Sequence, residues 1–154
     1  MQRVKAPRSR VGGLRPERPN VLCVPSHRRV EEWIAAYERA WRTAGAEPLA
    51  ELFADDAVYS MGPFEEPARG LAAIAELWER ERRGPDEEFE VSHEVVALEA
   101  NTAVIRVEVR YGPPQRLHYR DLWIVRFGAD GRCRGFEEWP FWPEKGIVPE
   151  GGSR

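Results

Sequence analysis

The chain has 154 residues, of which 42% are hydrophobic and 32% are charged, as is typical of one globular domain. Its net charge of −3 hides a basic segment, residues 1–20, ahead of an acidic body. An acidic body disfavours nucleic-acid binding, because a polyanion requires a clustered cationic face. No apolar run approaches the roughly 18 residues that span a bilayer. We therefore expect a soluble, cytoplasmic protein that binds neither nucleic acid nor membrane.

The sequence predicts one domain with an extension at each end. Residues 1–25 are rich in proline, glycine and arginine and contain few apolar residues, so we expect a disordered basic extension. The domain is expected over residues 26–145, with a flexible tail over 146–154. Cys23 and Cys133 fit no metal-ligand spacing, and we expect neither a disulfide nor a metal site.

Three helices are predicted in the N-terminal half. The first begins after Ser26, a typical N-cap, and ends near Gly45; its apolar residues recur at helical spacing, namely Val30, Trp33, Ile34, Tyr37 and Trp41. A short second helix carries Leu49, Leu52 and Phe53. The third lies between Gly70 and Gly84-Pro85, with Leu71, Ile74, Ala75 and Trp78 on one face.

Strands are predicted in the rest of the chain. A brief strand is expected over residues 57–61, followed by a loop over 62–67 that contains two prolines. From residue 89 the apolar period becomes two, and turn residues divide the remainder into strands at 89–95, 104–111, 117–127 and 132–141. Helices followed by a strand meander indicate an α+β domain with the helices on one face of an antiparallel sheet.

The strand at 117–127 contains an acid in an apolar row. Alternation places Asp121 on the same face as the large residues Leu117, Tyr119, Trp123, Val125 and Phe127. That face is expected to lie against the helices. Asp121 is therefore predicted to be a buried carboxyl group.

In their order and spacing, these landmarks resemble the nuclear transport factor 2-like superfamily, and within it the SnoaL-like group of small bacterial proteins. The resemblance covers roughly residues 29–143 and rests on the segments 33–37, 52–59, 69–78, 119–123, 130–132 and 138–139. It implies a cone of curved sheet and three helices around a deep pocket for a small apolar or aromatic ligand. It also implies a homodimer paired through the sheets, for which Leu122 and Ile124 offer apolar contacts. Members include ketosteroid isomerase, scytalone dehydratase, limonene epoxide hydrolase and polyketide cyclases.

The candidate catalytic residues are Asp121, His93 and Tyr59. An apolar pocket disfavours the charged form of a carboxyl group, which raises its pKa towards values useful for acid–base chemistry. Alternatively, Asp121 pairs with Arg106, Arg120 or a tryptophan N–H and has only a structural role. His93 alternates with apolar residues and is expected to point inward, and Tyr59 is a candidate hydrogen-bond donor to a ligand. Tyr119 stands two residues before Asp121, where limonene epoxide hydrolase has arginine, which counts against epoxide hydrolysis.

The expected ligand-binding residues are mainly aromatic: Trp33, Tyr37, Phe64, Trp78, Tyr119, Trp123, Glu138 and Trp139. Only one of Glu137 and Glu138 can face inward. A regular hairpin that pairs Phe127 with Arg132 puts Glu138 opposite Asp121, whereas a one-residue bulge brings Glu137 and Trp139 inward. The sequence leaves both registers open.

Two functions remain open at this point. The first is a small-molecule-binding protein without catalysis. The alternative is an isomerase, cyclase or dehydratase that needs no cofactor and uses Asp121 as general acid or base on an apolar carbonyl compound. No nucleophile elbow, phosphate loop or dinucleotide fingerprint is present in the sequence.

Overall fold

The computed structural model describes residues 25–143. The expected basic extension up to residue 24, Cys23 and the expected tail lie outside the described residues. The elements follow in the order α1 (His27–Trp41), α2 (Leu49–Leu52), β1 (Phe53–Met61), β2 (Ala68–Arg69), α3 (Leu71–Glu81), a 3-10 turn η1 (Gly84–Asp86), β3 (Phe89–Glu99), β4 (Thr102–Tyr111), β5 (His118–Phe127) and β6 (Cys133–Phe141). In this part of the chain, no helix has the length and apolar character needed to cross a membrane.

The helices form close to where the sequence predicts them, but Phe53, expected on the second helix, is the first residue of β1, which therefore begins before the expected residue 57. The side-chain oxygen of Ser26 accepts a hydrogen bond from the backbone N–H of Arg29 at 3.3 Å, which confirms the N-cap of α1. α1 ends at Trp41, before Gly45, which has a φ of 81°. α3 ends at Glu81 because the backbone of Arg82 is already extended, ahead of Gly84-Pro85.

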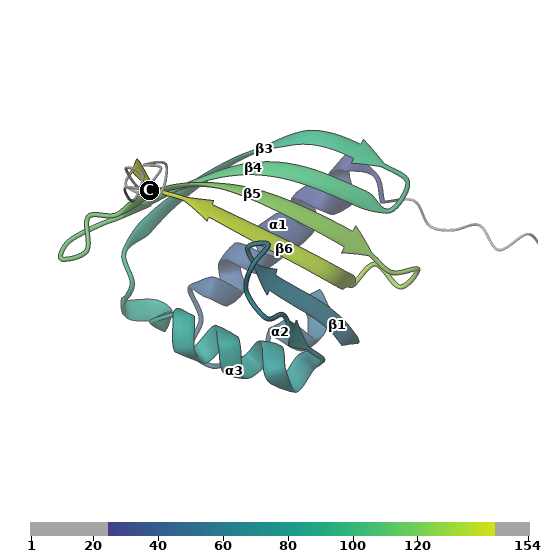
Figure 1. The fold of residues 1–154 in the computed structure, drawn as a ribbon, viewed down its shortest axis with the longest axis horizontal. Coiled ribbons are helices and arrows are strands. Elements are labelled where there is room, and N and C mark those ends of the chain that lie inside the picture. The colour runs from purple at the N-terminus through teal and green to yellow at the C-terminus, as the bar shows by residue number, and fades with distance from the viewer. Residues whose placement is uncertain (1–24, 144–154) are drawn as a thin grey trace, which may run out of the picture.

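The six strands form one sheet in the order β2-β1-β6-β5-β4-β3 (Figure 1). The strands from β3 to β6 are the predicted antiparallel meander. β1, however, pairs with β6 in parallel, so the sheet is mixed rather than wholly antiparallel. No tight turn joins these two strands, and their mutual direction was therefore not determined by a hairpin.

A bulge near the start of β6 determines which of its residues face inward. Phe127 pairs with Cys133, but after a register shift Trp123 pairs with Glu138 and Asp121 with Pro140. A bulge is therefore present, yet it lies early enough that both Cys133 and Glu138 are buried. Neither predicted register is correct in full, since Glu138 faces inward but lies opposite Trp123.

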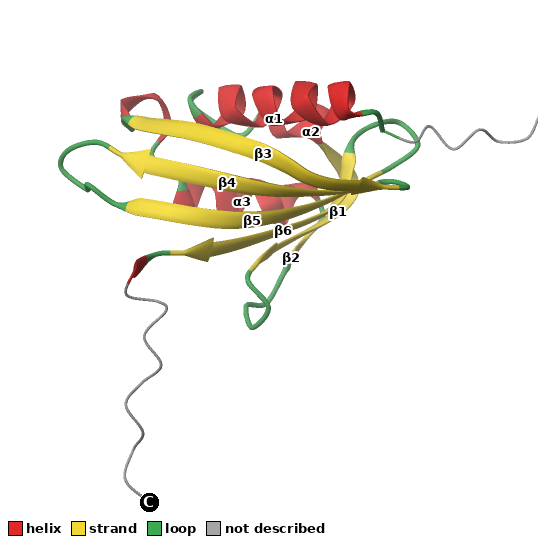
Figure 2. Ribbon diagram, turned by 90° about the horizontal axis from the view of Figure 1, so that it is seen from above, coloured by secondary structure: helices red, strands yellow, loops and turns green. Residues whose placement is uncertain are grey.

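The sheet curves around α1, and all three helices lie on its concave side (Figures 1 and 2). α3 packs against β1 and β2, at one end of the strand order. The core between the layers is strongly aromatic, and its largest fully buried side chains include Trp41, Trp123, Tyr37, Phe53 and Phe136. The α+β cone expected from the sequence is confirmed.

Candidate active site

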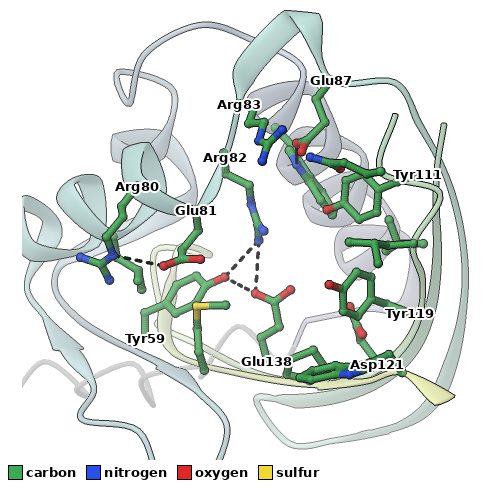
Figure 3. Close-up of a pocket in the computed structure, with 18 of the residues that line it drawn as sticks. Tyr59, Arg80, Glu81, Arg82, Arg83, Glu87, Tyr111, Tyr119, Asp121 and Glu138 are labelled. Atoms are coloured by element: carbon green, nitrogen blue, oxygen red, sulfur yellow. Dashed lines mark hydrogen bonds and ion pairs between the residues drawn. The ribbon is translucent and has the colours of Figure 1, made fainter. Parts of the chain in front are cut away.

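A pocket of about 490 Å³ lies between the C-terminal end of α3 and the concave face of the sheet. Figure 3 shows Arg82, Tyr59, Glu138, Tyr119 and Asp121 around the same space. The sequence predicted an apolar pocket, but the lining is mixed. It consists of Trp41, Tyr59, Met61, Glu65, Glu66, Leu77, Arg80, Glu81, Arg82, Arg83, Glu87, Val109, Tyr111, Gln115, Leu117, Tyr119, Asp121, Glu138, Pro140 and Trp142.

Asp121 is placed in this pocket by the alternation of β5. Its side chain faces the concave side between Tyr119 and Trp123, and the residue is only 5% exposed. The alternative pairing with an arginine of the sheet is not observed, because Arg106 bonds Glu94 at 2.6 Å and Arg120 is exposed. Oδ1 of Asp121 has no hydrogen-bond partner among residues 25–143.

The surroundings of Asp121 raise the pKa of its carboxyl group, so that it can take up and release a proton near neutral pH. Burial, with a further contribution from the charge of Glu138, raises the pKa of Asp121 to about 7. The charge of Arg82 opposes this rise. A carboxyl group with a pKa near the working pH is suited to general acid–base catalysis.

A hydrogen-bonded network forms the neighbouring wall of the pocket. The hydroxyl of Tyr59 donates to Oε2 of Glu138, and the hydroxyls of Tyr37 and Tyr59 lie 3.0 Å apart. Nη2 of Arg82 is 3.2 Å from the same carboxylate oxygen and 3.1 Å from the Tyr37 hydroxyl. Burial, followed by the charge of Glu138, raises the pKa of both tyrosines, which therefore stay protonated.

Arg82 is the site residue that the sequence prediction missed. Its guanidinium carbon lies 4.2 Å from the ring centroid of Trp41 and 5.1 Å from that of Trp78, at distances typical of cation–π contacts. The signal was present, because Ile74, Trp78 and Arg82 are spaced by four in the sequence, although Arg82 itself lies one residue beyond the end of α3. An arginine on the apolar face of a predicted helix indicates a buried polar partner.

His93 lies away from the pocket, contrary to expectation. It stands on β3, which is one of the two edge strands of the sheet. Its Nε2 atom lies 2.6 Å from Oε2 of Glu31 on α1. The alternation along β3 places His93 on the side of the sheet that carries α1. At the edge of the sheet, however, this side chain lies against α1 and does not reach the pocket. Among residues 25–143, no histidine lines the pocket beside Asp121.

Phe64 and Trp139 also depart from their predicted positions in the pocket. Phe64 is 98% exposed in the loop between β1 and β2, although its neighbours Glu65 and Glu66 line the pocket. Trp139 pairs with Leu122 on the outer face of the sheet, because the β6 bulge turns Glu138 inward instead.

Of the other aromatic residues predicted to bind a ligand, Tyr119 lines the pocket. The remaining four belong to the hydrophobic core and do not line the pocket. They are Trp33, Tyr37, Trp78 and Trp123. The indole of Trp33 donates to the carbonyl of Leu52 at 3.1 Å, which fixes it between α1 and the start of β1. Of the four, Tyr37 comes nearest to a site function, through its hydroxyl.

The described residues also show no cluster of three or more His, Cys, Asp or Glu side chains placed to hold a metal ion. The acidic pair at the start of β1 has structural partners, since Asp55 bonds Arg132 at 3.1 Å and Asp56 bonds Arg134. The candidate chemistry therefore depends on Asp121, Glu138, Arg82 and the two tyrosines.

Solved structures with the same fold include several with different functional names. An LEH-like epoxide hydrolase from Mycobacterium tuberculosis is 18% identical, with a TM-score of 0.58 over 73% of this chain and 78% of that one. A candidate ketosteroid isomerase from Kribbella flavida is 18% identical, with a TM-score of 0.57 over 82% and 90%. A protein of unknown function with a cystatin-like fold from Methylobium petroleophilum is 23% identical, with a TM-score of 0.60 over 84% of each chain.

At these identities the structures show a shared fold and no shared activity. A comparison with curated proteins gave no significant match. The model of the SnoaL-like domain matches residues 30–136, which is more than half of the sequence. The chain therefore belongs to the SnoaL-like domain family.

Proposed function

We propose that this protein is a proton-transfer enzyme in which Asp121 is the general base. The observation that carries the proposal is a buried carboxyl group in a pocket, with one oxygen unpartnered among the described residues. A carboxyl group with only a structural role is normally satisfied by hydrogen bonds when it is buried. An incompletely satisfied one, with a raised pKa, is characteristic of a functional site.

The proposed substrate is a small carbonyl compound with an apolar body. The carboxylate of Asp121 removes a proton from the carbon next to the carbonyl group and returns it to the same or a conjugated carbon, which gives an isomerisation or begins a cyclisation. The aromatic side chains of Trp41, Tyr111 and Tyr119 supply apolar surface in the pocket. The name of the Kribbella flavida neighbour agrees with this class of reaction.

Epoxide hydrolysis is less well supported, although one neighbour carries that name. The position two residues before Asp121 is held by Tyr119, which contacts Tyr111 and Trp142. No guanidinium is therefore supplied from that position of β5. Proton transfer requires only the base and a polar group for the carbonyl oxygen.

The test follows hydrogen–deuterium exchange at the carbon next to the carbonyl group, by NMR, in a panel of cyclic and conjugated ketones in heavy water. We expect the wild type to catalyse exchange in at least one ketone, and Asp121→Asn to lose about 10²-fold or more of that rate. Glu137→Gln is the matched control, because Glu137 lies on the outer face and bonds Arg126 at 2.7 Å. Equal rates for wild type and Asp121→Asn would leave a binding protein without catalysis.

The homodimer remains part of the proposal. Leu122, Ile124 and Trp139 are half-buried on the outer face of β5 and β6. A second copy seated on this face would remove their remaining apolar surface from water. Exposed charged side chains flank the patch on both sides, including Arg120 and Arg126.

A further inference from the structure

The hydrogen-bonded wall next to Asp121, which carries Tyr59, Arg82 and Glu138, is where donors for a ligand are to be sought (Figure 3). Glu138 can only accept when it is ionised, so the single proton of the Tyr59 hydroxyl is directed to its carboxylate. The Tyr59 oxygen then accepts from the Tyr37 hydroxyl, 3.0 Å away. Both tyrosine protons are thus used inside the network, and neither hydroxyl has a proton left for a ligand.

Arg82 is the remaining donor of this wall. A guanidinium carries five N–H groups, and the three hydrogen bonds that Arg82 makes within residues 25–143 all leave from Nη2. Nε has no acceptor there, although it is buried. The side chain is 9% exposed and lines the pocket. Arg82 therefore offers unused donors from a side chain that is nearly buried in the pocket wall.

The placement of Arg82 is rigid. The rings of Trp41 and Trp78 lie close to the guanidinium, and Glu138 holds Nη2. The Arg82 charge also acts on Asp121, whose pKa it lowers, yet no ion pair joins the two residues within the described chain. Arg82 and Asp121 thus line one pocket without forming an ion pair. A base and an electrophile that act on the same substrate must remain separate in this way.

Building on the proposed proton transfer, the geometry points to Arg82 as the residue that binds the carbonyl oxygen of the substrate and stabilises the enolate formed there. Asp121 takes the proton, the C–H electron pair forms the new C=C bond, and the carbonyl π pair moves to the oxygen beside Arg82. Reprotonation by Asp121 reverses these movements, so no other reactant is required. Because the guanidinium is already fixed, little reorganisation accompanies the developing charge.

The inference can be tested without any substrate, using 4-nitrophenol as a probe. Its neutral and ionised forms absorb at different wavelengths, and its phenolate oxygen imitates the enolate. The measurement is made in Asp121→Asn, because this variant gives the pocket the charge that it has after proton abstraction. We expect the bound probe to ionise at lower pH than the free probe does in water.

Removal of Arg82 should abolish this effect. In Asp121→Asn carrying Arg82→Met, the pKa of the bound probe should rise by about one unit or more, which is about tenfold in ionisation. If this variant does not fold, the comparison is made in a Glu138→Gln background, where no unpaired carboxylate is left, and Arg82→Met should again raise the pKa of the bound probe relative to Asp121→Asn with Glu138→Gln alone. Arg80→Met is the matched control, because Arg80 lines the pocket but pairs with Glu81 at 3.1 Å.

The inference would be overturned if the probe binds Asp121→Asn as the neutral phenol or not at all, or if its ionisation is unchanged without Arg82. Failure of the proposed function is a separate result, namely no ketone exchange by the wild type. A probe that ionises through Arg82 in a protein without exchange activity would define a binding site for anionic oxygen and would remove only the catalytic step.

Discussion

Arg82 and Glu138 form a buried ion pair beside the candidate general base. Nη2 of Arg82 lies 3.2 Å from Oε2 of Glu138, and their side chains are 9% and 4% exposed. Two tyrosine hydroxyls form further hydrogen bonds with this pair: Tyr59 donates to Glu138, and Tyr37 accepts from Arg82. The pocket thus contains two carboxyl groups. Glu138 is paired with Arg82, whereas Asp121 forms no ion pair among residues 25–143.

Because Arg82 and Glu138 form a buried ion pair, we expect their substitutions to have non-additive effects on the free energy of unfolding. Arg82→Met leaves the Glu138 carboxylate buried without its cation, and we expect a loss of about 3–5 kcal/mol in the free energy of unfolding. Glu138→Gln should cost a similar amount. The double variant should lose clearly less than the sum, as measured by denaturant unfolding in a double-mutant cycle. Additive losses would show that the two side chains do not stabilise each other.

The pH dependence of stability follows from Asp121. Its pKa is about 7 in the folded protein and about 3.9 in an unfolded chain. Between these values the folded state holds a proton that the unfolded state has released, so the contribution of Asp121 to stability falls as the pH rises from about 4 to about 7. The three-unit difference corresponds to at most about 4 kcal/mol.

Asp121→Asn lacks this titration and should gain stability relative to the wild type across the same interval, with a constant difference above about pH 7. Unfolding free energies of both proteins at several pH values provide the measurement. A difference that does not change between pH 4 and 7 would mean that the carboxyl group titrates normally.

His93 provides a prediction of no effect on catalysis. Its partner is Glu31, at 2.6 Å on the surface side of α1, and it does not line the pocket. His93→Gln should therefore keep the exchange activity and lose less than about 1 kcal/mol of stability. Activity assays beside Asp121→Asn decide this point, and a loss of activity as large as that of Asp121→Asn would contradict the assignment of the site.

The proposed dimer is tested by placing a charge on the outer face of β5. Leu122→Lys should shift the protein to a monomer in sedimentation analysis, because a buried lysine without a partner opposes association. Arg120→Gln is the control on the same face and strand, where the side chain is already exposed. A wild type that sediments as a monomer at all concentrations would remove the dimer from the proposal.

The sequence predicted the α+β order of elements and the inward side of Asp121 because both depend on simple periodicity, whereas the cone was implied by the family resemblance. Alternation alone placed Asp121 inward on β5, and the N-cap at Ser26 was visible as a residue type. The position of Glu138 was undetermined because one bulge in β6 decides it, and the marker of that bulge, Gly135 inside the strand, was not used in the prediction.

The other differences arise from tertiary structure. Alternation along β3 gave the correct side of the sheet for His93. The strand order, which the sequence does not reveal, places β3 at an edge of the sheet, so His93 does not line the pocket. The parallel pairing of β1 with β6 joins segments that no turn relates. Arg82 was recognisable from its four-residue spacing to Trp78 in the sequence, but its contact with Glu138 on the distant strand β6 is what makes it a site residue.

The proposed chemistry depends most on the ionisation of Asp121. The direct measurement is an NMR titration of protein carrying ¹³C-labelled aspartate side-chain carboxyl groups, with the Asp121 signal assigned from its absence in Asp121→Asn. We predict a midpoint of about 7, raised by burial. A midpoint near 4, the ordinary value for aspartate, would contradict the proposal that this carboxyl group is the base of the pocket.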